Sequence, residues 1–315
     1  MTNLIIRPTS GQKNIFKPSG GRVGVKSIGN APATTVLLSS DWSTTTGTSN
    51  SALLDDGKSN AWDQVGYGTN RLTVVSATGF DFPAGMSNIF RVTHPAGTQN
   101  YSQVQKFWDQ IDVGETIYYR WYNRIDIADS EGNLVDAGYH PMETPIGLGN
   151  FTTNGEIVFK YFSYNDGTFV MRLEFQNNYN KYFGAGTNFQ SAPDHLDKFK
   201  AYRFEMALTR VSTGGSWDKA ALSMKIFDDN MSTTVPLWDD DTISGFDFDG
   251  GPGLHNGTLS SGYGQDLDIN AHGFTCIETG TNGGGWTLTA QQYSYWGGFR
   301  VQLGDWCGPY VPGES

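Results

Sequence analysis

An all-β sandwich with an extended N-terminal arm is the fold class that the sequence predicts. The chain of 315 residues contains 40 glycines and 14% aromatic residues, a composition typical of many short strands joined by tight turns. Runs with an apolar residue at every second position recur along it, and this period marks strands that bury one face. The first acidic residue is Asp41, so every charged side chain before it is basic.

Residues 1–33 are predicted to be an attachment arm. They hold five basic residues among glycines and short apolar pieces, whereas the remaining chain holds 16 basic and 32 acidic residues. Such a segment can add as a strand to the edge of a partner's sheet; a disordered tail and an extra β-hairpin of the same domain are the alternatives. The charges form no polybasic block, and a net charge of −11 repels phosphates, so we expect no nucleic-acid partner. The basic residues are Arg7, Lys13, Lys17, Arg22 and Lys26.

Residues 34–315 are predicted to form the sandwich. After an opening strand at 35–38, residues 41–70 are polar and predict a long loop with room for one helical turn. Ser102–Gln110 is the one helix expected, and the tail at 306–310 is expected to pack against the domain. Further strands are expected at 71–76, 88–93, 116–127, 156–164, 167–176, 200–210, 220–227 and 297–303.

The alternation is clearest at 169–176, where the odd-numbered residues are apolar. The even-numbered residues include Arg172, Glu174 and Gln176, so these three polar residues share one face of the strand.

Residues 239–296 interrupt the strand pattern with a Gly/Asp-rich insertion. Its acidic cluster, Asp239–Asp241 with Asp247 and Asp249, offers the oxygen ligands that Ca²⁺ prefers, but the spacing matches no EF-hand loop. A solvated acidic loop is the favoured interpretation, and a calcium site at Asp247 and Asp249 is the alternative. The histidines are scattered, and no other cofactor motif occurs.

No apolar run reaches the length of a membrane span, so no membrane partner is predicted. The N-terminus lacks the apolar core of a secretory signal peptide, which predicts synthesis in a host cytoplasm. Cys276 and Cys307 are the only cysteines, and two free thiols are favoured over a disulfide in a reducing compartment.

Four segments carry a family resemblance that spans roughly residues 70–310. Tyr118–Ile125 resembles the long central strand of concanavalin A-like jelly rolls, a superfamily of polysaccharide lyases, glucanases and legume-lectin-type domains. Ala201–Met206 with Leu222–Asp229 resembles the succeeding strands, and Gly298–Leu303 is similar to the last strand. The resemblance implies a concanavalin A-like jelly-roll sandwich, and a fold does not by itself decide a function.

A sharper resemblance lies at 182–190, Tyr-Phe-Gly-Ala-Gly-Thr-Asn-Phe-Gln, which is similar to the Tyr-Phe-Lys-Ala-Gly-x-Tyr-x-Gln box of alginate-lyase-type jelly rolls. In that family the Lys and the second Tyr work at the active site, the Tyr as acid and base. Here Gly184 and Asn188 stand at those positions, and an asparagine cannot transfer the proton. Arg172-x-Glu174-x-Gln176 only loosely matches the family's Arg-x-Glu-x-Arg strand, and its Gln-Ile-His element is absent. We therefore expect the jelly-roll scaffold of this family without its lyase activity.

Six residues are candidates for a glycan-binding groove. Guanidinium groups bind carboxylates through paired hydrogen bonds and aromatic rings stack on sugar rings, so such a groove would suit an acidic glycan. An ordinary solvated sheet face is the alternative. The candidates are Arg120, Tyr122, Arg124, Arg172, Gln176 and Arg203.

Catalytic candidates are weak. A glucanase of this fold needs two carboxylates at alternating positions of one strand, and no such run occurs. Arg124, Glu174 and Glu205 remain. For the two glutamates the favoured interpretation is a cross-strand ion pair with Arg172 or Arg203.

The leading functional interpretation is a non-enzymatic protein of a virion surface, made without a signal peptide and released by lysis. It would be a capsid decoration or fibre-associated phage structural protein, docked through its arm to another virion protein, with a possible glycan-binding face. A trimer is the expected homo-oligomer, since many virion appendages project along three-fold axes. The alternatives are a polysaccharide lyase or glycoside hydrolase acting as a virion depolymerase on an acidic glycan, and a free lectin-like carbohydrate-binding module.

Overall fold

A computed structural model gives the architecture for the greater part of the body. The residues that it describes are 14–16, 24–26, 33–66, 71–94, 102–108, 112, 114–126, 141–150, 155–163, 169–176, 182–183, 199–214, 217–229, 238–240, 273–281 and 291–314.

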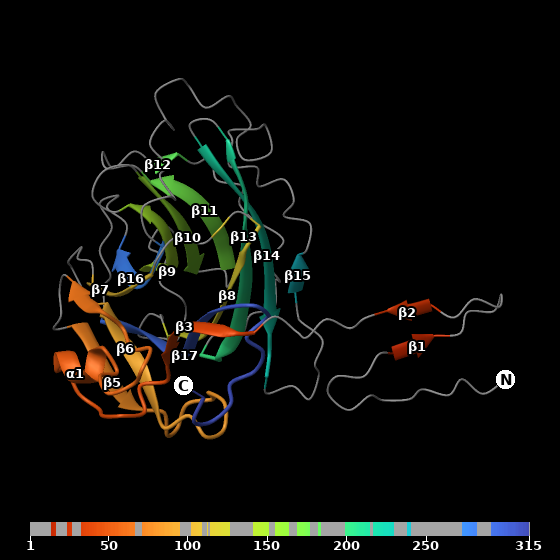
Figure 1. The fold of residues 1–315 in the computed structure, drawn as a ribbon. Helices are drawn as coiled ribbons and strands as arrows, with labels where there is room; N and C mark the ends of the chain where they lie inside the picture. The colour runs from red at the N-terminus through yellow and green to blue at the C-terminus, as the bar shows by residue number, and fades with distance from the viewer. Residues whose placement is uncertain are drawn as a thin grey trace.

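Two antiparallel sheets make up the body (Figure 1). The eight-stranded sheet has the order β15-β14-β13-β8-β17-β6-β5, with β3 also paired to β17. Its strands are β3 (Thr35–Ser40), β5 (Leu72–Ser76), β6 (Asn88–His94), β8 (Thr116–Asp126), β13 (Tyr202–Gly214), β14 (Trp217–Phe227), β15 (Trp238–Asp240) and β17 (Gln292–Leu303).

The seven-stranded sheet has the order β12-β11-β10-β9-β16-β7-β4. Its strands are β4 (Gln64–Gly66), β7 (Ser102–Trp108), β9 (Pro141–Asn150), β10 (Gly155–Ser163), β11 (Phe169–Gln176), β12 (Tyr182–Phe183) and β16 (Gly273–Thr281).

Aromatic side chains fill the main core. Trp121 of β8 stacks on Phe204 of β13 with the ring centroids 5.5 Å apart and an angle of 2° between the planes, and it stacks on Phe299 of β17 at 6.2 Å. Trp108 of β7 reaches Tyr119 of β8 at 6.4 Å, which is a contact between the two sheets. Odd-numbered residues of β8 therefore point inward, and even-numbered residues such as Arg120 point to the outer face.

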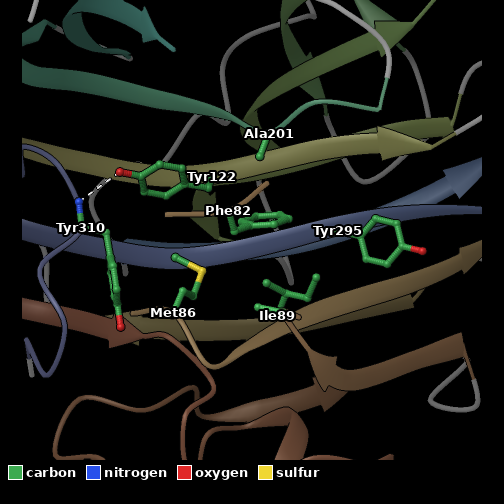
Figure 2. Close-up of a cluster of buried hydrophobic side chains, with 8 residues drawn as sticks. Phe82, Met86, Ile89, Tyr122, Ala201, Tyr295 and Tyr310 are labelled. Carbon is green, nitrogen blue, oxygen red and sulfur yellow. Dashed lines mark hydrogen bonds between the residues drawn. The ribbon is translucent and has the colours of Figure 1, made fainter. Parts of the chain in front are cut away.

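A second, smaller core covers part of that outer face (Figure 2). It forms around a bulge of β17, where Gly297 and Gly298 present no side chain. A Cβ atom at Gly297 would overlap the sulfur of Met86, and one at Gly298 would lie 3.0 Å from the Met86 methyl carbon. The two glycines thus let a loop pack directly on the sheet. The buried members of this outer core are Ala77, Phe82, Met86, Ile89, Tyr122, Ala201, Tyr295 and Tyr310.

The predicted all-β sandwich is confirmed, and each of the expected strands is present. The short helix α1 (Asn50–Leu53), capped by Ser49, is the helical turn expected within 41–70. This helix is the only one among the described residues, and its four residues are far too short to cross a membrane.

The helix expected at Ser102–Gln110 is wrong, because strand β7 occupies Ser102–Trp108. Its sequence has no clear period of two, and both Val104 and its neighbour Gln105 are buried. Pairing with β4 on one side and β16 on the other decides the conformation, as sheet context commonly does.

The two long strands β9 and β16 were not expected from the sequence, and neither were the short strands β4, β12 and β15. β9 contains Pro145, and the register against β10 shifts opposite this part of the strand, which is where a sheet tolerates proline. β16 lies inside the stretch 239–296 that was expected to be an insertion, yet it pairs with both β9 and β7. The stretch thus supplies an interior strand of the seven-stranded sheet.

The N-terminal arm contains a hairpin. β1 (Asn14–Phe16) pairs with β2 (Gly24–Lys26) as a separate two-stranded sheet, to which no other described strand is paired. The described part of the arm is thus a β-hairpin, a form that suits either an attachment arm or an extra hairpin of the domain.

Candidate functional site

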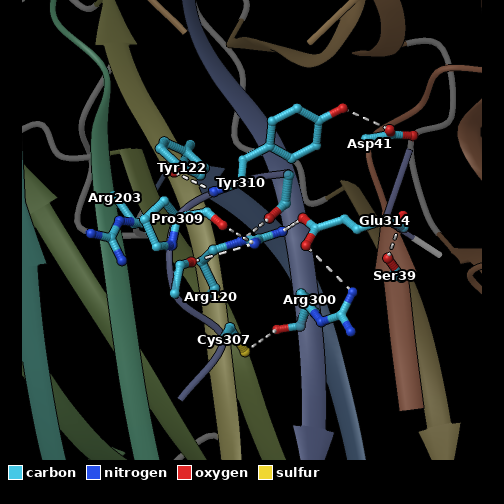
Figure 3. A network of polar contacts seen from close by, with 12 residues as sticks. Ser39, Asp41, Arg120, Tyr122, Arg203, Arg300, Cys307, Pro309, Tyr310 and Glu314 are labelled. Atoms are coloured by element: carbon cyan, nitrogen blue, oxygen red, sulfur yellow. Dashed lines mark hydrogen bonds and ion pairs between the residues drawn. The ribbon is translucent and has the colours of Figure 1, made fainter. Parts of the chain in front are cut away.

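The outer face of β8 and β13 carries four of the six residues predicted to line a glycan groove. Three of them, Arg120, Tyr122 and Arg203, are buried, with 1%, 1% and 5% of their surface exposed. The cover is the C-terminal segment, residues 304–314, which crosses this face and bonds to it (Figure 3). These three residues therefore do not line an open groove, and that prediction is wrong.

Arg120 holds the C-terminal segment in place. Its Nε donates to the Gly298 carbonyl at 2.9 Å and its Nη1 to the Pro309 carbonyl at 3.2 Å, while its Nη2 pairs with the Glu314 carboxylate. Arg300 Nη1 lies 3.5 Å from the same carboxylate. Burial alone would lower the pKa of the Arg120 guanidinium, but the bond to Glu314 outweighs it and raises that pKa, so the group stays charged.

Arg203 holds two carboxylates beside Arg120. Its Nη1 pairs with Glu205 and its Nε donates to Asp229 Oδ1 at 3.0 Å. The Tyr122 hydroxyl donates to Asp229 and accepts from the Tyr310 N–H at 3.0 Å. Burial raises the pKa of Glu205, while the Arg203 charge opposes that rise. For Glu205, the sequence favoured an ion pair with Arg203 over a catalytic role. That ion pair is present, but both residues lie on the same strand, β13.

Tyr310 fastens the same segment at a second point. Its hydroxyl donates to Asp41 Oδ2 at 2.9 Å, and Lys58 Nζ lies 3.0 Å from Asp41 Oδ1. Burial by itself would raise the pKa of Asp41, but the hydrogen bonds from Ser43, Lys58 and Tyr310 outweigh burial and lower it. The tail predicted at 306–310 therefore does pack against the domain.

Arg124, a candidate for both binding and catalysis, is occupied by two carboxylates. Its Nε and Nη2 donate to the two oxygens of Asp126 at 2.7 and 3.0 Å, and its Nη1 donates to Asp81 at 3.0 Å. Asp81 in turn accepts from the Ala201 N–H at 2.8 Å. This arrangement positions the loop that carries Asp81 and leaves no free fork on Arg124 for a substrate carboxylate.

Arg172, Glu174 and Gln176 lie on β11, in the other sheet. Their side chains fall outside the described residues, and the register gives their positions: Arg172 opposite Lys160, Glu174 opposite Val158, and Gln176 opposite both Glu156 and Tyr182.

The described end of the same sheet carries amide side chains. Gln103 and Gln105 of β7 alternate with Trp108, which points at the other sheet, so they lie on the face turned away from it. Gln64 of β4 bonds to Gln105, and Phe107 on this face is 37% exposed. Following the register through β16, β9 and β10 puts Arg172 and Gln176 on this same outward face.

The predicted calcium ligands Asp247 and Asp249 lie outside the described residues, and the described part of the chain holds no cluster of His, Cys, Asp or Glu that could bind a metal. Cys307 is a free thiol, and burial raises its pKa to about 12, so it is protonated and unreactive at neutral pH. Cys276 lies on β16, with its side chain outside the described residues.

Sequence reasoning missed the acidic partners Asp41, Asp81, Asp229 and Glu314. The Asp-rich turn after β14 was a signal for Asp229. Nothing in the local sequence connects Glu314 with Arg120, because the two are 194 residues apart.

Comparison with known proteins gives structural neighbours alone. No protein-family model matches the chain, and no curated protein matches it in sequence. Among solved structures, a marine alginate lyase from Aplysia kurodai matches with a TM-score of 0.49 at 11% identity, over 85% of this chain and 98% of that one. An alginate lyase from Chlorella virus (TM-score 0.46, 11% identity, 82% and 98% covered) and an endo-1,3-beta-glucanase from Streptomyces sioyaensis (0.46, 13%, 87% and 99%) also match. Similarity at this level says nothing about the activity of this chain.

Replacing Glu314 tests the role of the C-terminal segment. Glu314→Ala leaves the buried Arg120 charge without its carboxylate, so we expect the free energy of unfolding to fall by about 3 kcal/mol. Urea denaturation measures it. Asp112→Ala removes an exposed carboxylate that makes no side-chain hydrogen bond among the described residues, and it should change stability by less than about 0.5 kcal/mol. Equal effects of the two substitutions would contradict the assignment.

Asp41 predicts a specific acid dependence of stability. Because its folded-state pKa lies below the unfolded value, its contribution is present above the unfolded pKa and is lost as pH falls through the folded pKa. Thermal unfolding between about pH 7 and pH 3 should show the wild type losing stability below about pH 4 more steeply than Asp41→Asn. Asp56→Asn, at an exposed carboxylate, is the control and should keep the wild-type slope. Parallel curves for wild type and Asp41→Asn would refute the role of Asp41.

Proposed function

We propose that this chain is a carbohydrate-binding protein that holds an acidic polysaccharide on the outward face of its seven-stranded sheet without cleaving it. The observation that carries the proposal is the register of β9 to β12. It aligns Gln176 with Glu156 and Tyr182 in one row, and sets Arg172 beside Lys160 in another.

The residue types on this face suit a chain of uronic acids. The two adjacent cations favour carboxylates, Glu156 and Glu174 on the same face oppose them, and amide and phenol groups hydrogen-bond to sugar hydroxyls. Gly147 and Gly149 of β9 lie opposite Val158 and Glu156, where the absence of side chains leaves room for a ligand to approach the sheet. At the described end, the exposed residues Gln64 and Phe107 continue the same character, while Gln105 is buried beneath them and bonded to Gln64.

The absence of cleavage is supported by the state of the catalytic candidates. Arg124 is held by two aspartates, and Glu205 is 3% exposed and bound to Arg203. Gly184 and Asn188 replace the two working residues of the lyase box in the sequence. The side chain of Glu174, the third candidate, lies outside the described residues.

A binding assay tests the function. The purified chain should be retarded in gels containing alginate or polygalacturonate but not in gels containing a neutral glucan. Arg172→Gln should weaken the retardation on the order of tenfold, the loss expected for one charge-assisted contact. Lys225→Gln, a cation lost from the other sheet, is the control. A steady rise in ultraviolet absorbance from unsaturated product, abolished by Glu174→Gln, would contradict the non-enzymatic reading and favour a lyase.

We further propose that the basic hairpin of the arm docks the chain onto another protein at the surface of an assembly such as a virion. A two-stranded hairpin is marginally stable alone in water, so a partner that extends it would stabilise it. Each strand of this hairpin has an edge to which no other described strand is paired, and such edges accept a further strand. The arm's charge would favour an acidic partner.

Deleting residues 1–33 tests docking. The full chain should co-sediment with particles from the producing host, and the truncated chain should remain at the top of the gradient with its fold intact by circular dichroism. A variant with Lys13→Gln and Lys17→Gln separates charge from strand addition, because it keeps the hairpin. Full occupancy of the truncated chain on the particles would end the docking proposal.

A further inference from the structure

A strip of aromatic rings and guanidinium groups lies at one end of the outer face of the eight-stranded sheet, beyond the C-terminal segment. Tyr293 and Tyr295 of β17 lie side by side with ring centroids 6.3 Å apart, and Phe80 packs on Tyr295 at 4.5 Å. The Arg91 guanidinium of β6 lies over the Tyr293 ring at 5.1 Å. Arg124 lies at the end of the strip, with its guanidinium carbon 5.2 Å from the centroid of the Phe80 ring.

Arg91 differs from the other arginines of this face. Arg120, Arg124, Arg203 and Arg300 each bond to at least one carboxylate. Arg91 has no carboxylate among the described residues, and its buried Nε has no hydrogen-bond acceptor there. Arg91 is partly buried, and in a chain with more acidic than basic residues an arginine without a carboxylate can accept an external anion through its Nη groups.

The contact with Tyr293 leaves the Nη end of this guanidinium as the part that a ligand can reach, because the Nε is buried. The two Nη groups carry N–H donors that can bind a carboxylate. The ring fixes the group in advance, so less conformational entropy is lost when a ligand binds.

The surroundings favour a sugar over a bare anion. Tyr293 and Phe80 are only partly buried, so their rings offer apolar surface for a sugar ring. The Tyr293 hydroxyl already bonds to Gln291, and Figure 2 shows the Tyr295 hydroxyl pointing away from the packed end of the outer core. Asp81 and Asp126, whose side chains are 31% and 16% exposed, lie at the end occupied by Arg124. Their charges disfavour a densely sulfated glycan and tolerate one carboxylate per sugar.

We propose that Arg91, Tyr293, Tyr295 and Phe80 form a second glycan site, which binds a uronic acid residue of an acidic polysaccharide. Arg91 takes the carboxylate, and the aromatic strip contacts the ring of the same or the adjoining sugar. The site lies on the eight-stranded sheet, so it is separate from the face proposed above and does not depend on it. Two sites on different sheets would bind one polymer with avidity, or link two.

Short ligands separate this site from avidity effects. Isothermal titration calorimetry of the full chain with an oligogalacturonate of three or four units, as about the length that one site spans, gives the affinity at each site. Arg91→Gln should weaken one binding event on the order of tenfold or more, and Tyr293→Leu should do the same by removing the ring. Tyr293→Phe keeps the ring and should retain most of the affinity. Circular dichroism confirms that each variant is folded.

Lys225→Gln is the matched control. Lys225 also lies over an aromatic ring on this sheet, 4.7 Å from the Trp306 centroid, but three strands separate β14 from β6. Its loss should leave binding unchanged. A neutral oligosaccharide of the same length should not bind at the Arg91 site, and a sulfated one should bind more weakly than the uronate.

The outcomes distinguish this inference from the proposed function. Wild-type affinity in Arg91→Gln, or an equal loss in Lys225→Gln, overturns the second site, whatever Arg172→Gln does. Binding that Arg91→Gln weakens and Arg172→Gln leaves unchanged supports the second site and counts against the face on the seven-stranded sheet. Stronger binding of the sulfated ligand overturns the assignment to uronic acids.

Discussion

The Arg120 guanidinium lies at the point where three distant parts of the chain meet. It projects from the centre of β8, bonds to the backbone of β17 at its bulge, and binds the carboxylate of Glu314. Because a buried arginine requires acceptors for its donors, the C-terminal segment must lie over this face for the charge to be tolerated. The same placement brings Tyr310 to Asp41 and its N–H to Tyr122, so one ion pair organises the cover over the central part of this sheet face.

This arrangement divides the outer face into two regions of opposite character. Under the C-terminal segment, cations and carboxylates neutralise one another and leave nothing for a ligand. Beyond it, around Arg91, the aromatic strip continues, but the described carboxylates are bound to Arg124 instead. A chain so rich in acidic groups repels anions over most of its surface, so an anionic glycan would be confined to the few places where cations are left available.

Sequence reasoning reached the fold class because the alternation in β8, β11, β13 and β14 is strong. It missed β9, where Pro145 weakens the pattern, and β16, whose surroundings are rich in glycine and polar residues. It also placed Arg120, Tyr122 and Arg203 correctly on one polar face, yet inferred that the face was open. Alternation shows that a face is polar and does not show what covers it, because the covering residue Glu314 is far away along the chain.

The position of β17 has a consequence for how the protein is made. This strand pairs with β6 on one side and β8 on the other, so it lies inside the eight-stranded sheet although it follows every other described strand in sequence. During synthesis β6 and β8 leave the ribosome long before β17, the strand that joins them. Until β17 is made, each of the two has an edge without a hydrogen-bonded neighbour. The sheet can close only after residues 292–303 leave the ribosome. A chain stalled or cut before residue 292 would therefore present two unjoined half-sheets and a strong tendency to aggregate.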